Sequence, residues 1–211
     1  MQSDEPTLAE GAEETLLRAG FATTPDFVDV LRAGLLAERP RLRVLALRGA
    51  TRHSLVTTDD WRRALGDPDV DVRREALRLV AYVEVDPVII DLVIAALGDA
   101  DPLVVDAAAF ALGEHQCERA VERLCEVAIG HDDARCREAA VAALGAIGDD
   151  RGRAAVLGAL EDKAPVRRRA IVALTNFEGA DIDAALERAG QDRDWQVRAA
   201  VDQLRRDDDL D

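Results

Sequence analysis

Several residue types are scarce in this sequence, and each shortage excludes a class of structure. Aromatic residues make up only 3% of the 211 residues, whereas alanine and leucine are plentiful. A core of short side chains suits closely packed helices better than a β-sandwich, because β-branched and aromatic residues dominate strands. The three cysteines are an odd number without the spacing of a disulfide framework, which is typical of a reducing compartment.

Long hydrophobic runs are missing as well. No stretch approaches the roughly 18 uninterrupted apolar residues that a membrane-spanning helix needs. Residues 1–17 are acidic and lack the basic segment and apolar run of a secretory signal. We therefore expect a cytoplasmic protein without a membrane partner.

Positive charge is in short supply. The formal net charge is −15, and such a surface repels phosphate backbones, so we expect no nucleic-acid partner. Lys163 is the only lysine, and aspartate outnumbers glutamate. This bias is typical of a salt-rich cytoplasm, in which charge repulsion is screened, or of a GC-rich genome, and both sources stay open.

What the sequence does contain is a repeat. Six apolar lead residues, each followed by a similar pattern, lie 30, 32, 32, 30 and 31 residues apart, at Leu42, Val72, Val104, Cys136, Val166 and Val197. A fixed period of this length predicts stacked structural units, each of which buries its apolar face against its neighbours.

Within each unit the pattern predicts two helices. In most units the lead residue and the residues four and eight positions after it are apolar and share one face of the second helix. An acidic turn precedes the lead residue, and its aspartate can cap the second helix. Pro102 and Pro165 fit the first helical turn. We predict a single domain over 1–211 with a capping helix over 7–19 and an acidic tail over 207–211. Between them we predict six helical hairpins, at about 25–52, 58–83, 87–114, 118–147, 151–177 and 181–206.

The second-helix signature, an acidic turn followed by Val-Arg-x-x-Ala-x-x-x-Leu-Gly, resembles the HEAT-like repeats of the phycobilisome-lyase type. The segments Ala-Phe-Ala-Leu-Gly-Glu at 109–114 and Ala-Ala-Leu-Gly-Ala-Ile at 142–147 are most similar to them. The resemblance implies an all-α, right-handed superhelix of the HEAT or armadillo kind with about six hairpins. It leaves the function open, because the family includes lyases, hydroxylases and plain scaffolds.

In five of the six repeats an arginine follows the lead residue. We predict that these arginines form a structural ladder, each bridging turn carboxylates and carbonyls of its own or the neighbouring repeat. A row of anion-binding sites is the alternative, but Val105 interrupts the row. The ladder residues are Arg43, Arg73, Arg137, Arg167 and Arg198.

A group of metal-type ligands lies in repeats three and four, at His115, Cys117, Cys125, His131 and Cys136. Its residue types suit zinc, but the spacing matches no zinc motif. In the repeat register, Cys136 and Cys125 take core positions and His131 takes the place of a turn aspartate. We therefore predict packing positions, no metal site and no cofactor.

Enzymatic relatives are tested by their site residues. Deoxyhypusine hydroxylase, which has HEAT-like repeats, binds two irons through His-Glu dipeptides, and this sequence contains none. A bilin-lyase-like or metal-dependent enzyme subunit stays as the alternative function. The basic groove of HEAT-like DNA glycosylases is not expected at this net charge.

The sequence favours a non-enzymatic scaffold that binds another protein or peptide segment on the concave face of the solenoid. Positions two and six after each lead residue are expected to project from the second helices. We expect Arg74, Arg78, Phe110, Arg168 and Val172 to contact an acidic, partly apolar segment. The alternative for Phe110 is burial under the next helix.

The net charge of −15 leads to a prediction on salt. Because salt screens repulsion between carboxylates, the melting temperature should rise between low and molar potassium chloride. Thermal unfolding followed by circular dichroism measures it, and a flat or falling melting temperature would contradict the prediction.

Overall fold

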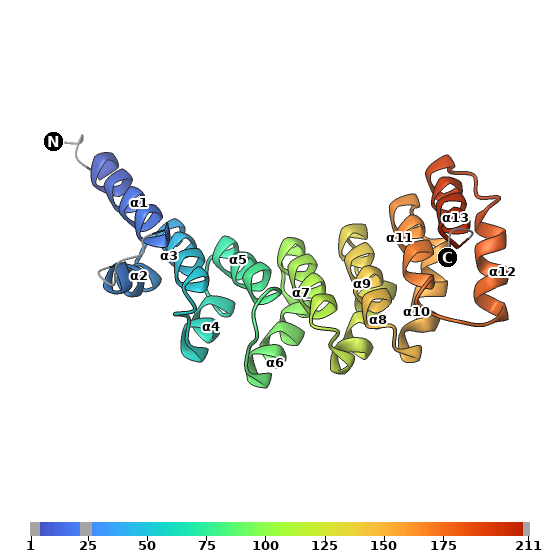
Figure 1. Cartoon of the computed structure of the whole chain (residues 1–211), viewed down its shortest axis with the longest axis horizontal. Coiled ribbons are helices and arrows are strands. Elements are labelled where there is room, and N and C mark those ends of the chain that lie inside the picture. Colours follow the sequence, from blue (N-terminus) through green and yellow to red (C-terminus); the bar gives the residue numbers. More distant parts are fainter. Residues whose placement is uncertain (1–4, 22–26, 209–211) are drawn as a thin grey trace. The chain divides into compact units, whose positions relative to one another are not determined.

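The computed structural model describes residues 5–21 and 27–208, and these residues form 13 α-helices, short 3₁₀ turns and no strand (Figure 1). The prediction of an all-helical chain is confirmed. The chain divides into two compact units, Met1–Leu92 and Val93–Asp211, and each is described by itself.

The first unit contains a leading helix and two hairpins. The leading helix α1 (Glu5–Phe21) packs against α2 and α3, so the predicted capping helix is present and longer than expected. The two hairpins pair α2 (Phe27–Leu35) with α3 (Pro40–Arg52), and α4 (Thr58–Leu65) with α5 (Val70–Val80).

The second unit contains four second helices and their partners. The helix α6 (Pro87–Ala95) contains the boundary between the units. The helices that follow are α7 (Pro102–Glu114), α8 (Val121–Gly130), α9 (Ala134–Ile147), α10 (Arg153–Gly158), α11 (Ala164–Leu174), α12 (Ala180–Ala189) and α13 (Trp195–Asp208). Each of α7, α9 and α11 lies beside the next second helix in the chain.

Several predicted bounds need correction. The second helices of repeats two and five end at Val80 and Leu174, three residues before the predicted ends. The predicted acidic tail is wrong at its start, because α13 continues to Asp208, while 209–211 lie outside the described residues. The predicted start of repeat one, Pro25, lies outside them too.

The acidic turns begin the second helices as the sequence predicts. The side chains of Asp69, Asp101 and Asp133 accept hydrogen bonds from backbone N–H groups in the first turn of α5, α7 and α9. Pro102 is the first residue of α7, and Pro165 is the second residue of α11. A backbone N–H at these positions has no hydrogen-bond partner within the helix, so proline loses no hydrogen bond there.

The lead residues build the core of the second unit. Val104, Cys136, Val166 and Val197 are buried, as are Ala108, Ala140 and Ala170 four residues after the first three. In the first unit Val72 is buried, but Leu42 is only half-buried. A fully buried side chain of this kind stabilises a fold by about 1.5–3 kcal/mol.

Glycines let successive second helices approach closely. A Cβ added to Gly145 of α9 would lie 2.5 Å from the Cβ and 2.7 Å from the Cα of Ala173 on α11. A Cβ on Gly113 of α7 would lie 3.1 Å from the Cα of Ala143 on α9. The Leu-Gly of the repeat signature therefore marks the point where one helix backbone rests on the next.

Replacing Gly145 by alanine should force α9 and α11 apart and cost about 2 kcal/mol or more of unfolding free energy. Chemical denaturation measures the loss. Gly158→Ala is the matched control, because nothing lies within 4 Å of its added Cβ and alanine is the better helix former. Equal losses in both variants would show that the close approach is not the cause.

Candidate functional site

The repeated arginines join consecutive repeats through paired hydrogen bonds. Arg167 donates from Nε and Nη2 to the two carboxylate oxygens of Asp192, each at 2.8 Å. Arg137 contacts Asp162 in the same way at 2.6 and 2.7 Å. In the first unit, Arg43 contacts Asp67 at 2.8 and 2.7 Å.

The remaining guanidinium nitrogen of each arginine binds the turn before its own helix. Nη1 of Arg137 donates to the carbonyl oxygens of His131 and Asp132 at 2.6 and 3.1 Å. Nη1 of Arg73 and of Arg198 donates likewise to the carbonyls of Asp67 and Asp192 at 2.8 and 2.6 Å. Each of these side chains thus closes its own turn, and those of Arg43, Arg137 and Arg167 also hold the turn of the next repeat.

These pairs are largely buried, so each charge needs its partner. The Arg167 side chain is only 6% exposed, so its charge depends on Asp192. The hydrogen bonds from Arg137 and Arg167 lower the pKa of Asp162 and Asp192 below their usual range, against the opposing effect of burial. In Arg43, Arg137 and Arg167 all three guanidinium nitrogens donate hydrogen bonds within the protein, and this leaves them little capacity for an external anion.

Where the row of arginines is interrupted, the aspartate that would be its partner is also missing. Val105 stands in α7 where the other second helices carry the arginine, and it is buried. His131 stands where the partner aspartate would lie, and its Nδ1 accepts a hydrogen bond from the Asp133 N–H at 3.0 Å. Arginine and aspartate are therefore absent together, and neither charge is left unpaired.

The cysteines lie in or near the core. Cys117 and Cys136 are buried, whereas Cys125 is half-buried, so the core prediction for Cys125 is only partly correct. Burial raises the pKa of the Cys136 thiol to about 11 and also raises that of Cys125. Within the described residues, no three His, Cys, Asp or Glu side chains are placed to hold a metal ion.

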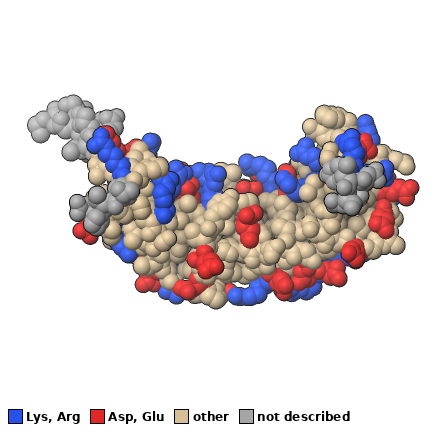
Figure 2. All heavy atoms as spheres, viewed as in Figure 1, with Lys and Arg blue, Asp and Glu red and all other residues tan. Residues whose placement is uncertain are grey.

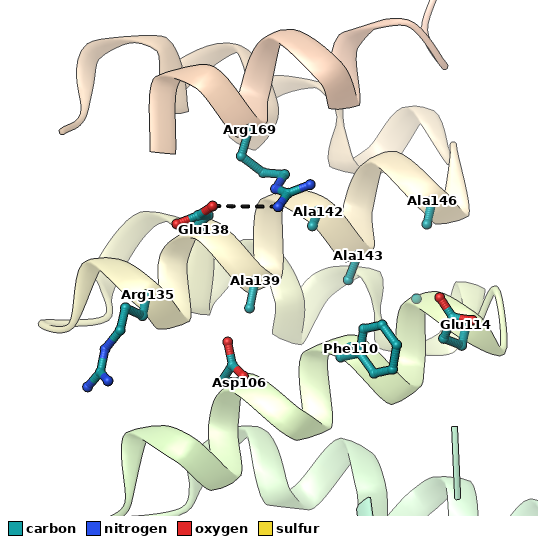
Figure 3. A pocket seen from close by; sticks show the side chains of 11 residues that line it. Asp106, Phe110, Glu114, Arg135, Glu138, Ala139, Ala142, Ala143, Ala146 and Arg169 are labelled. Atoms are coloured by element: carbon teal, nitrogen blue, oxygen red, sulfur yellow. Dashed lines mark ion pairs between the residues drawn. The ribbon is translucent and has the colours of Figure 1, made fainter. Parts of the chain in front are cut away.

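An open groove with a volume of about 510 Å³ lies between α7 and α9 (Figure 3). We call it the α7–α9 groove. Four alanines of α9 line it opposite Phe110, whose side chain is 42% exposed. The charged lining residues are Asp106 and Glu114 of α7, Arg135 and Glu138 of α9, and Arg169 of α11.

The two arginines of the groove have acidic partners. Arg135 contacts the Asp133 carboxylate at 2.7 Å, and Arg169 lies 3.6 Å from Glu138 (Figure 3). Asp106, Phe110 and Glu114 follow one another at four-residue intervals and therefore share one face of α7. Sequence reasoning placed Asp106 and Phe110 together at projecting positions but did not name Asp106 as a contact residue, and it missed Glu114, for which the four-residue spacing was a signal.

The other predicted contact residues lie elsewhere. Arg74 and Arg78 belong to α5 in the first unit, and Arg74 contacts Asp71 at 2.8 Å. Arg168 and Val172 of α11 do not line the groove, and Arg168 donates to Gln196 of α13 at 3.1 Å. Val172 is 47% exposed. Within the second unit, the structure therefore does not unite these residues with Phe110 in one cavity.

The visible surface carries mixed charge. Figure 2 shows acidic and basic residues interspersed among uncharged areas. Among the described residues, no helix has the length and apolar character needed to span a bilayer.

The sequence pattern of HEAT repeats matches three overlapping parts of the chain, residues 58–128, 90–175 and 121–205. The matches together cover more than half of the chain. They confirm the resemblance to HEAT repeats but not the finer phycobilisome-lyase type. No curated protein matches the chain.

Solved structures share the fold at low identity. YibA of Escherichia coli is 16% identical with a TM-score of 0.60, over 95% of this chain and 74% of that one. An engineered protein is 17% identical with a TM-score of 0.54, over 96% and 90%. A designed armadillo repeat protein in complex with the peptide (KR)4 is 14% identical with a TM-score of 0.53, over 95% and 93%. The predicted HEAT- or armadillo-like solenoid class is confirmed.

Asp192→Asn tests the arginine contacts. It leaves the buried Arg167 without its carboxylate and should cost about 3 kcal/mol of unfolding free energy at pH 7. Because the folded pKa of Asp192 is lowered, its contribution is present above the unfolded pKa of about 3.9 and is lost as pH falls through the folded value. The difference in unfolding free energy between Asp192→Asn and the unmodified protein should therefore narrow below about pH 4.

Urea denaturation at several pH values measures this gap. Asp150→Asn is the control, because that carboxylate is 87% exposed and 3.9 Å from Arg153, and such pairs contribute little. A gap between Asp192→Asn and the unmodified protein that is constant with pH would contradict the proposed role of Asp192.

Proposed function

Because the chain belongs to the HEAT-repeat family, we propose that it is a non-enzymatic scaffold that binds a segment of another protein. The observation that carries this proposal is the α7–α9 groove with Phe110 exposed along it. The predicted location in the cytoplasm is part of the same proposal.

The groove is suited to a peptide for physical reasons. Its two walls are helices in close contact at Gly113, and Arg137 fixes the turn before α9, so little conformational entropy is lost on binding. Its alanine side offers small side chains, which leave room for those of a ligand. An exposed aromatic ring beside such a surface is a typical anchor for a partner.

One of the fold neighbours supports a peptide as the ligand class, since the designed armadillo repeat protein is in complex with a peptide. No observation favours the alternative of a bilin-lyase-like or metal-dependent enzyme subunit. The raised pKa values of Cys125 and Cys136 disfavour thiolate chemistry at neutral pH. Participation of Arg74, Arg78, Arg168 and Val172, and the concave character of the binding face, stay predictions.

Phe110→Ser tests the groove. A peptide is first selected from a random display library on the immobilised protein, and its dissociation constant is then measured by fluorescence anisotropy. Loss of the aromatic anchor should weaken binding at least about tenfold, which corresponds to about 1.4 kcal/mol. The melting temperature should change little, because the ring is partly exposed.

Ile129→Ser is the matched control. Ile129 lies at the end of α8, is 73% exposed and does not line the groove, so its replacement should leave binding unchanged. If Phe110→Ser binds the selected peptides as tightly as the control, the groove is not the binding site.

A further inference from the structure

We propose that the α7–α9 groove binds an extended peptide segment of the form basic–x–apolar–x–basic. This inference rests on the proposed function and adds the chemistry of the partner. It starts from three residues on one face of α7: Asp106, Phe110 and Glu114, which Figure 3 shows along the groove.

The spacing of the two carboxylates fits an extended ligand. Eight residues separate Asp106 from Glu114, which corresponds to about 12 Å along a helix. In an extended chain, residues i and i+4 lie about 13 Å apart and point to the same side, with i+2 between them. Two basic side chains can therefore reach the two carboxylates while the middle side chain lies against Phe110.

The groove lining carries more negative than positive charge, because the carboxylates of Asp106, Glu114 and Glu138 outnumber the guanidinium groups of Arg135 and Arg169. Its two arginines have acidic partners, Arg135 with Asp133 and Arg169 with Glu138, and the charge of Asp106 also acts on Arg135. The Glu114 carboxylate is exposed and makes no ion pair with another described residue. A lysine or arginine of the ligand can pair with Glu114 and contact the face of the Phe110 ring, which attracts cations.

The alanine side of the groove suits the rest of the ligand. Ala139, Ala142, Ala143 and Ala146 present only methyl groups, so the aliphatic stems of long basic side chains can lie along α9. The sequence-based expectation of an acidic partner segment depended on Arg74, Arg78 and Arg168, and none of these lines the groove. An acidic ligand is therefore the competing outcome of the test.

The experiment measures binding of three synthetic nonapeptides to the full chain by fluorescence anisotropy at about 0.15 M salt. The first carries Lys-Ser-Leu-Ser-Lys at its centre, the second has the same composition with the two lysines adjacent, and the third has glutamate in place of lysine. The first peptide should bind at least tenfold more tightly than the other two.

Matched charge variants separate a specific site from general attraction to an acidic protein. Asp106→Asn with Glu114→Gln should weaken binding of the first peptide at least tenfold. Glu178→Gln with Glu187→Gln removes the same charge from exposed positions of the second unit outside the groove, and should change binding less than twofold. Circular dichroism verifies that both double variants remain folded.

The outcomes distinguish the inference from the function on which it rests. Equal weakening in both double variants, or equal binding of the first two peptides, overturns the basic motif. Preference for the glutamate peptide, abolished by Phe110→Ser, overturns the basic motif but keeps the groove as a protein-binding site. If none of the peptides binds and Phe110→Ser leaves the library-selected ligands unaffected, the proposed function fails as well.

Discussion

The paired hydrogen bond from an arginine to the aspartate of the next turn is the contact on which the stack depends. A single guanidinium, such as that of Arg137, closes the turn before its own helix and holds Asp162 of the following repeat. The same side chain thus sets both the start of one helix and the position of the next. A helical hairpin that buries its apolar face against its neighbours is stabilised by such a link, because the link fixes where the neighbour packs.

The groove lies between α7 and α9, the two second helices that lack this link at Val105 and His131, and a close approach at a glycine holds them together instead. The contact of Gly113 with Ala143 brings α7 and α9 together at one end of the helices. Small residues continue along α9, whereas α7 carries Phe110 and two carboxylates. The short alanine side chains of α9 allow α7 to pack closely, and they also leave the space of the groove between the two helices. The binding surface is therefore a consequence of how the repeats pack and requires no added loop or domain.

The repeat register predicted most of the fold from the sequence, because the period places the same residue types at the same depth. Cys136 and Val166 are buried as the register requires. It was only partly correct at two positions, because Cys125 and Leu42 are half-buried where the register predicts core residues. The site was harder to predict. The spacing predicted the outward position of Phe110. It did not predict that the arginines of the groove would pair with other carboxylates and leave that of Glu114 exposed.

The absence of both charges at Val105 and His131 offers the most direct test of the central contact. Inserting the missing pair as Val105→Arg with His131→Asp should restore the bridge between α7 and the turn before α9. We expect Val105→Arg alone to destabilise the protein, because it buries an unpaired charge, and the double variant to be more stable than the sum of the two single changes predicts. Denaturant unfolding of the four proteins measures this coupling. A favourable coupling of about 1 kcal/mol or more supports the account, and additive effects would contradict it.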